Sequence, residues 1–313
     1  CYVHYNITKF FSYQGGLMNN FRMPKIGWMV LANDAHIDPE MRDDEGRVYP
    51  VITLAEKSAR KLISLGYDII RYEGEEGLIK GKLGNELQTS NFSRDRIVTN
   101  SSKTFDAINI FNTENVDCVI CYLPNWIYAG YHIQALKKSV APIILWVPLV
   151  SEGAPVCAGA VMHGSLDEIG IDHRIVYSDI LNDPDDKKAL REIGVYTQCF
   201  KVKNILSKSR YGRLGGRSMG ANPARLDYID WMKIFGVDIE EIDQLNLILE
   251  SEKSTDEEIN IVFNKIRNMV SETPEFDDTF KKAVKLYIGY KKIIDSYKLD
   301  FASLKCLFEL SNN

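Results

Sequence analysis

Nearly continuous apolar runs alternate with helical segments along the first half of the chain. Residues 24–32, 116–123 and 141–150 are such runs, which are typical of strands covered on both faces. Between them lie segments with apolar residues at helical spacing, of which 51–65 ends at Gly66, a helix-stop signal. This alternation predicts an α/β fold, with two Rossmann-like domains whose mainly parallel sheets are flanked by helices. Further strands are expected over 67–72 and 174–177, and helices over 104–111, 131–139 and 154–169.

The sequence predicts three parts along the chain. Residues 1–22 are rich in aromatic side chains and show no clear period, so we expect a non-native or disordered leader there. Residues 23–181 form an N-terminal α/β domain. The polar stretch 182–188 is typical of the start of a connecting helix, and residues 182–313 follow as a second α/β domain, truncated at or near its end. In that domain we expect a helix through Trp231 and Met232, strands over 237–242 and 299–304, and helices over 255–271 and 277–297.

The composition argues against several classes of protein. Hydrophobic residues make up 45% of the chain and charged residues 26%, which is the balance of a globular protein. The net charge of -5 is small and mixed, so no nucleic-acid partner is expected. No run of 18 apolar residues occurs, and we expect no membrane partner. Six cysteines without a convincing signal peptide predict a reduced, cytoplasmic setting.

Two of the cysteines have the spacing of a redox or metal-binding motif. Cys118 and Cys121 form a Cys-x-x-Cys, but both lie inside the apolar run 116–123. Motifs of that kind usually lie on a turn or at the start of a helix. We therefore expect buried strand thiols at these two positions.

Ligands of open parallel sheets gather at the carboxyl ends of the strands, which selects the loops 33–42, 124–130 and 151–155. Trp126 in the second loop either forms a stacking wall for a sugar ring or packs between a helix and the sheet. Trp146 lies inside its strand and is expected in the core. The first loop carries polar side chains that suit a metal site, a substrate contact or a subunit contact, namely Asp34, His36, Asp38 and Glu40. The other histidines, His4, His132, His163 and His173, are scattered and show no ligand spacing.

A glycine cluster in the second domain is the strongest candidate for a ligand loop. The stretch 215–220 reads Gly-Gly-Arg-Ser-Met-Gly and matches neither the P-loop nor Gly-x-Gly-x-x-Gly, which disfavours a nucleotide-dependent enzyme. Its glycines permit positive φ angles and a close backbone approach, Arg217 adds a cationic fork, and Ser218 is suited to cap a helix. A tight turn before a helix is the alternative interpretation.

The same region resembles the middle domain of the L-fucose isomerase family, relatives of the L-arabinose isomerases. Residues 122–128 and 146–153 are similar, more loosely, to the first domain of that family. The resemblance implies an N-terminal and a middle domain, with the C-terminal domain of the family missing. The residues that carry it are 214–220, Asp227, Trp231, 235–237, Ile242 and Asp243.

The resemblance implies reversible aldose–ketose isomerisation through an enediol, with a divalent metal, typically manganese (Mn²⁺), that polarises the carbonyl. The glutamate, aspartate and histidine that bind this metal in the family lie beyond the position that matches Asn313. No catalytic or metal residue is therefore assigned in this chain, and we expect a fragment that is inactive alone.

The resemblance also implies where substrate contacts lie. Arg217, Ser218 and Met219 would approach a small-molecule sugar within one subunit. Asp34, Arg42 and Trp126 would reach the active site of a neighbouring subunit, which implies a homo-oligomer with its site at the subunit interface. A non-catalytic two-domain sugar-binding or sensing module remains an alternative, since two α/β domains that close over a ligand suit that function equally well.

Overall fold

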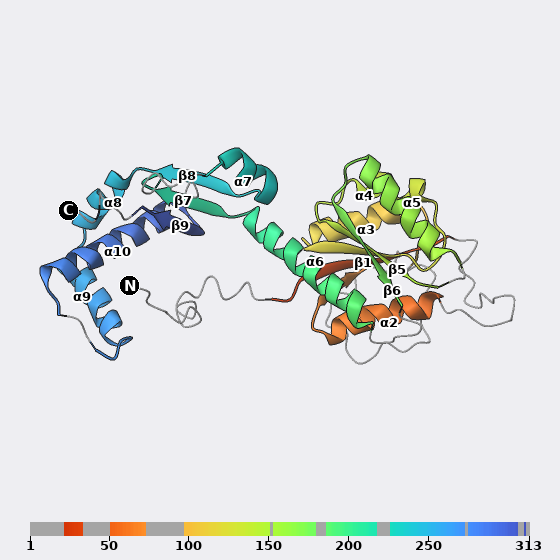
Figure 1. Ribbon diagram of the computed structural model, residues 1–313, viewed down its shortest axis with the longest axis horizontal. Helices are drawn as coiled ribbons and strands as arrows, with labels where there is room; N and C mark the ends of the chain where they lie inside the picture. The colour runs from red at the N-terminus through yellow and green to blue at the C-terminus, as the bar shows by residue number, and fades with distance from the viewer. Residues whose placement is uncertain are drawn as a thin grey trace. The chain divides into compact units, whose positions relative to one another are not determined.

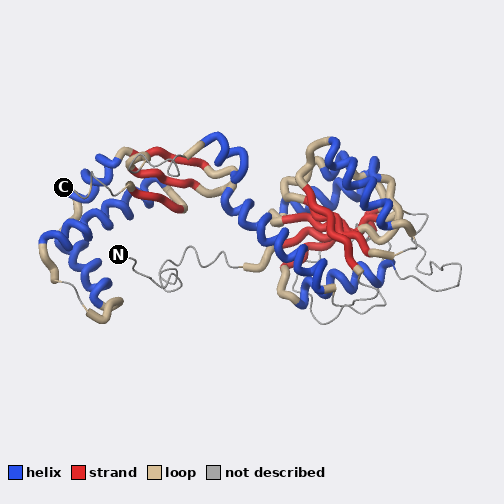
Figure 2. The backbone as a smooth tube through the Cα atoms, viewed as in Figure 1, coloured by secondary structure: helices blue, strands red, loops and turns tan. Residues whose placement is uncertain are grey.

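The computed structural model describes residues 22–33, 51–72, 97–150, 153–179, 186–217, 226–272, 275–305 and 310. The chain forms two compact units, Cys1–Val202 and Lys203–Asn313, which divide inside helix α6 (Lys187–Leu206) (Figure 1). The boundary expected at residue 182 precedes this helix. Both units contain a parallel sheet with helices packed against it, as the sequence predicts (Figure 2).

The first unit is built on one parallel sheet with the strand order β2-β1-β4-β5-β6, in which β3 also pairs with β1. Every strand that the sequence predicts in this unit is present, within a few residues of its expected ends. The short β3 was not predicted. The strands are β1 (Lys25–Leu31), β2 (Asp68–Arg71), β3 (Ile97–Val98), β4 (Cys118–Tyr122), β5 (Ile143–Pro148) and β6 (His173–Ser178).

Helices cover both faces of this sheet and make two separate cores. Helices α3 (Ser101–Thr113), α4 (Ile133–Leu136) and α5 (Pro155–Glu168) pack on one face, and α2 (Val51–Ser64) and α6 pack on the other (Figure 1). Successive side chains of a strand point to opposite faces, so alternate residues of each strand enter different cores. This two-sided burial explains why the strands are apolar at nearly every position. A short 3-10 turn, η6 (Ala129–Tyr131), precedes α4.

The predicted burial of individual side chains in this sheet is confirmed. Trp146 is buried in the core, where its ring lies edge-on to Trp28 and Tyr122 with centroids 5.8 and 5.7 Å away. Cys118 and Cys121 are buried thiols of β4. Burial raises the pKa of both thiols well above the ordinary range, and the nearby Asp117 carboxylate raises that of Cys118 further. Neither thiol is therefore a ready nucleophile or metal ligand.

The second unit has a three-stranded parallel sheet in the order β8-β7-β9. The sequence predicts β8, β9 and helices α7, α9 and α10, and all are present. It did not predict β7 or α8. The elements are β7 (Arg210–Leu214), α7 (Tyr228–Phe235), β8 (Asp238–Ile242), α8 (Gln244–Glu252), α9 (Asp256–Arg267), α10 (Asp278–Tyr297) and β9 (Phe301–Leu304).

None of the described helices combines the length and apolar character needed to cross a lipid bilayer.

Gly27 allows helix α3 to lie close against β1. A Cβ at this position would lie 2.7 to 2.9 Å from ring atoms of Phe111. We expect Gly27→Ala to lower the free energy of unfolding by about 1–3 kcal/mol, because the added methyl group overpacks the core. Urea denaturation of the full chain measures this effect.

Gly164 supplies the matched control for that measurement. It lies in α5, and a Cβ there would have no neighbouring atom within 4 Å. Gly164→Ala should leave stability unchanged or raise it by about 0.5–1 kcal/mol, since alanine favours the helix. If Gly27→Ala were as stable as the wild type, the close packing of α3 against β1 at Gly27 would be contradicted.

His132 is buried beside helix α3 and is held in its neutral form. The Thr104 hydroxyl donates its hydrogen to the Asn100 carbonyl oxygen at 2.7 Å, so its oxygen accepts from His132 Nδ1 at 2.8 Å. The neutral ring therefore carries its proton on Nδ1. Burial lowers the pKa of His132 from 6.5 to about 4.

Because this pKa is lower in the folded state, the unfolded chain binds more protons between pH 6.5 and 4. The stabilisation from neutral His132 is complete above pH 6.5 and is lost as the pH falls towards 4, by about 3 kcal/mol. His132→Asn keeps an N–H donor and does not titrate, so its stability should fall less steeply over this range. Urea denaturation at a series of pH values measures how steeply the stability of the wild type and of His132→Asn falls with pH. Equal slopes for the two proteins would contradict the lowered pKa of His132.

Candidate functional site

The three strands of the second unit end in the same row at one edge of the sheet. Leu214 at the end of β7 pairs with Ile242 of β8 and with Leu304 of β9. Beyond this row the backbone stays connected, because Gly215 N donates to Ile242 O at 3.1 Å and Lys305 N donates to Leu214 O at 2.9 Å. The residues that follow each strand are thereby brought together at the carboxyl edge, where ligands of parallel sheets bind.

Two glycines after β7 have backbone conformations that favour glycine. Gly215 has φ +87° and Gly216 has φ +70°, as the glycine cluster led us to expect. A Cβ on Gly215 would meet the Gln244 Oε1 atom at 3.0 Å and the Lys305 Cβ at 3.1 Å. A Cβ on Gly216 would meet nothing within 4 Å, so this residue faces open space.

These glycines line an open pocket of about 620 Å³, here called the β7–β9 pocket. Its polar side chains follow or end β8, and its apolar side chains come from Ile242 and the first turns of α8. The pocket thus combines carboxylate and amide groups with a small apolar surface. The lining residues are Gly215, Gly216, Glu241, Ile242, Asp243, Gln244, Leu245 and Ile248.

The polar groups of the pocket are held in place by contacts within the unit. Glu241 accepts from Arg213 at 3.2 Å, and the Asp243 carboxylate caps α8 by accepting from Leu245 N at 2.8 Å. The buried Gln244 donates from Nε2 to the carbonyl oxygen of Lys305. Such contacts orient the side chains in advance, so little conformational entropy is lost when a ligand binds.

Three of the other residues that carry the family resemblance have structural roles. Asp227 caps α7 by accepting from Ile229 N and Asp230 N at 3.0 and 3.1 Å. The Trp231 ring stacks on Tyr211 of β7 with centroids 5.6 Å apart. Gly236 ends α7 in the left-handed conformation with φ +73°. Of the described residues that carry the resemblance, Gly215, Gly216, Ile242 and Asp243 line the pocket.

Of the predicted substrate-binding residues, Arg217 and Trp126 lie in the described part of the chain, in different units. Arg217 is exposed directly after the two pocket glycines. Trp126 is partly buried, packs against the core of the first unit and lies edge-on to Tyr128 at 6.4 Å. This packing agrees with the structural interpretation of Trp126. Ser218, Met219, Asp34 and Arg42 lie outside the described residues, as do His36, Asp38 and Glu40.

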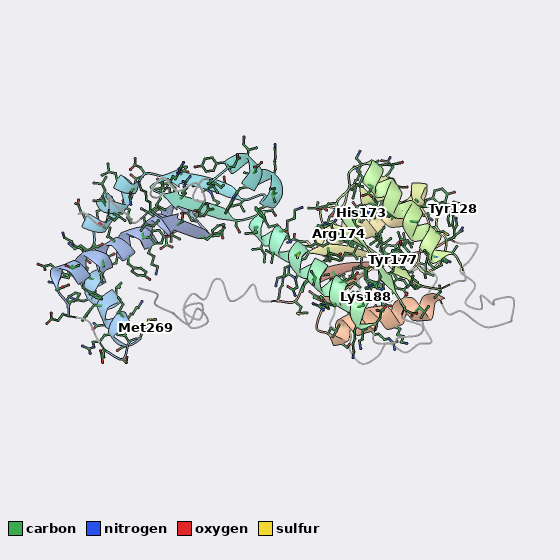
Figure 3. All side chains as sticks on the ribbon, in the orientation of Figure 1. Tyr128, His173, Arg174, Tyr177, Lys188 and Met269 are labelled. Atoms are coloured by element: carbon green, nitrogen blue, oxygen red, sulfur yellow. The ribbon has the colours of Figure 1, made fainter. Side chains whose placement is uncertain are left out.

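The structure brings together the described parts of the three predicted loops at the carboxyl edge of the first sheet. The buried Asn125 side chain accepts from Asn33 N at 3.4 Å, which joins the first loop to the second. Trp126 N donates to Gly153 O, which joins the second loop to the third. Tyr128 projects from the surface of this edge with 52% of its area exposed (Figure 3). The loops therefore form one surface, as the position of parallel strand ends requires.

The expectation that the histidines are scattered is wrong for two of them. His163 and His173 lie side by side, with Nδ1 and Nε2 2.6 Å apart, and both approach the Asp167 carboxylate. One signal in the sequence was missed. His163 and Asp167 are four residues apart in the predicted helix 154–169, a spacing that places both on one face.

Manganese, which the resemblance implies, does not fit the β7–β9 pocket on the residues present. The lining residues of the pocket offer two carboxylates, Glu241 and Asp243, and no histidine. Among the described residues, the group of three that could hold a metal ion is His163, Asp167 and His173 in the first unit. The pocket itself supplies acceptors for hydroxyl groups.

Comparisons with known proteins leave the family open. No family model and no curated protein matches the sequence. Among solved structures, the chain is similar to the crystal structure of an ABC transporter periplasmic solute-binding protein from Actinobacillus succinogenes 130z with bound D-allose. The alignment covers 90% of this chain and 77% of that one, at 14% identity and a TM-score of 0.24. A likeness this distant supports no conclusion about the ligand of this chain.

Proposed function

We propose that the second unit binds a small sugar in the β7–β9 pocket. The observation that carries this proposal is the position of two positive-φ glycines beside carboxylate and amide side chains at the carboxyl ends of three parallel strands. Glycines let the backbone approach a ligand closely, and the side chains accept hydrogen bonds from hydroxyl groups.

The remaining lining residues suit the same class of ligand. Leu245 and Ile248 provide apolar surface for the C–H groups of a sugar ring. Arg217 follows the glycines and is exposed, and on this proposal its guanidinium group would donate to ring or hydroxyl oxygens of the ligand. The protein holds the pocket groups in fixed orientations. A non-catalytic sugar-binding or sensing module needs such groups and no catalytic residues or metal ligands.

A second candidate function is that of an aldose–ketose isomerase of the L-fucose isomerase type. The observation that favours it is that Gly215, Gly216, Ile242 and Asp243 both carry the family resemblance and line the pocket. On this proposal Mn²⁺ would be held by residues that follow the position of Asn313. Ser218 and Met219 would contact the substrate in the same subunit, and Asp34, Arg42 and Trp126 would contact that of a neighbour in a homo-oligomer.

Sugar binding is tested by calorimetric titration of the full chain with L-fucose, L-arabinose and D-arabinose. We expect at least one to bind, and Gln244→Leu to weaken that binding about tenfold, since a polar ligand group loses its partner. Gly216→Ala should also weaken it, because the added methyl group faces the pocket and alanine is strained at the φ of +70° that the glycine adopts.

Asn246→Leu is the matched control for this series. Asn246 lies in the same turn of α8 but does not line the pocket, so affinity should stay at the wild-type value. Urea denaturation checks that Gln244→Leu remains folded, since Gln244 also bonds to Lys305 O. No binding of any of the sugars, or equal affinity in wild type and both pocket variants, would refute the proposal.

The two candidate functions differ in turnover. If the chain belongs to an isomerase, a longer polypeptide that includes the sequence encoded after Asn313 should interconvert L-fucose and L-fuculose with Mn²⁺. The 313-residue chain should not, because the described pocket lacks three metal ligands. An assay of ketose formation with and without Mn²⁺ measures this. Sugar binding without turnover in the longer polypeptide would favour the non-catalytic module.

A further inference from the structure

Two histidines and an aspartate meet at the amino edge of the first sheet. His163 and Asp167 lie on the last two turns of α5, one turn apart, and His173 is the first residue of β6. A tight turn with Gly170 at φ +70° brings β6 back beside the helix. Figure 3 marks His173 at the start of its strand. These three residues are called the His163–Asp167–His173 cluster below.

The ring of His173 is oriented as a metal ligand would be. Its side chain is 2% exposed, and its Nδ1 lies 2.8 Å from the carbonyl oxygen of Ile171. A carbonyl oxygen only accepts, so Nδ1 carries the proton and Nε2 presents its lone pair. That lone pair points at His163 Nδ1, 2.6 Å away. A backbone carbonyl that fixes the tautomer in this way is the usual outer partner of a metal-binding histidine.

The other two groups complete the site and leave it open to solvent. The Nε2 atom of His163 lies 3.5 Å from Asp167 Oδ2, and Asp167 Oδ1 lies 3.9 Å from His173 Nε2. The side chains of His163 and Asp167 are 43% and 63% exposed, so an ion can enter without displacing core residues. One ligand atom from each of the three residues lies within 4.8 Å of the others.

We propose that the His163–Asp167–His173 cluster binds a divalent transition-metal ion, with Zn²⁺ as the best match. Two imidazole nitrogens and one carboxylate oxygen are a ligand set of zinc, with water in the fourth position. Magnesium and calcium prefer oxygen ligands throughout and suit this set poorly. Tetrahedral ligands of zinc lie about 3.3 Å apart, a spacing that the two exposed side chains reach by small rotations from atoms that already lie within 4.8 Å of one another.

The location of the cluster gives the ion a structural role. It joins the end of α5 to the start of β6, the edge strand of the sheet, across the turn that contains Gly170. The amino edge is opposite the carboxyl edge, where the loops of this unit meet. A bound ion would fix the turn and the edge strand without touching that surface.

The test is calorimetric titration of the full chain, without a polyhistidine tag, with zinc chloride in a chelator-free buffer at neutral pH. We expect one Zn²⁺ ion to bind to the cluster. His163→Gln and Asp167→Asn should each weaken this binding by at least about tenfold. The side chains of His163 and Asp167 are 43% and 63% exposed, so the variants should fold, whereas the buried His173 is left unchanged.

Asp172→Asn is the matched control, because it removes the same charge from an exposed aspartate that neighbours the cluster and pairs with Arg174 at 4.0 Å. It should keep the wild-type zinc affinity. Zinc should also raise the thermal unfolding midpoint of the wild type and of Asp172→Asn, and of neither ligand variant. Absence of zinc binding in the wild type, equal affinity in all four proteins, or a loss in only one ligand variant would overturn the three-ligand assignment.

Discussion

Parallel backbone pairing is the constraint on which both candidate sites depend. Because every described strand of each sheet runs in the same direction, their carboxyl ends share one edge and their amino ends share the other. The pairing of Leu214 with Ile242 and Leu304 places the residues after β7, β8 and β9 around one pocket. The same geometry places His173, at the amino end of β6, next to the end of the preceding helix. The side chains at each edge then determine which kind of ligand can bind there.

In the second unit, several residues that carry the resemblance support the fold and do not line the pocket. Asp227 and Gly236 begin and end α7, and Trp231 packs its ring on β7. Asp243 serves both purposes, since its carboxylate caps α8 and also lines the pocket. A motif that spans 214–243 therefore reports mainly on how α7, β8 and α8 fold. The parts of it that bear on a ligand are Ile242, Asp243 and the glycine pair, whose positive φ angles no helix or strand requires.

The sequence predicts best the elements that are buried on both faces. The strands β1, β4 and β5 were found because two-sided burial leaves them almost without polar positions. β7 was missed because three of its five residues are only partly buried and two are arginines. α8 was missed because Asp243 ends the strand signal of β8 and caps the next helix at once. The histidine cluster depends on a turn that returns β6 to α5, and spacing along the chain does not reveal such a contact across a turn.

The two proposed sites rest on separate observations, and this separation bears on the isomerase proposal. That reaction would need its metal at the sugar, and the groups that suit a sugar line the carboxyl edge of the second sheet. The His163–Asp167–His173 cluster lies in the other compact unit and at the amino edge of its sheet. Zinc bound there would stabilise the α5–β6 connection. Metal binding by the wild-type chain is therefore no argument for isomerase chemistry. Metal binding that persisted in the His163→Gln variant would instead point to a second metal site.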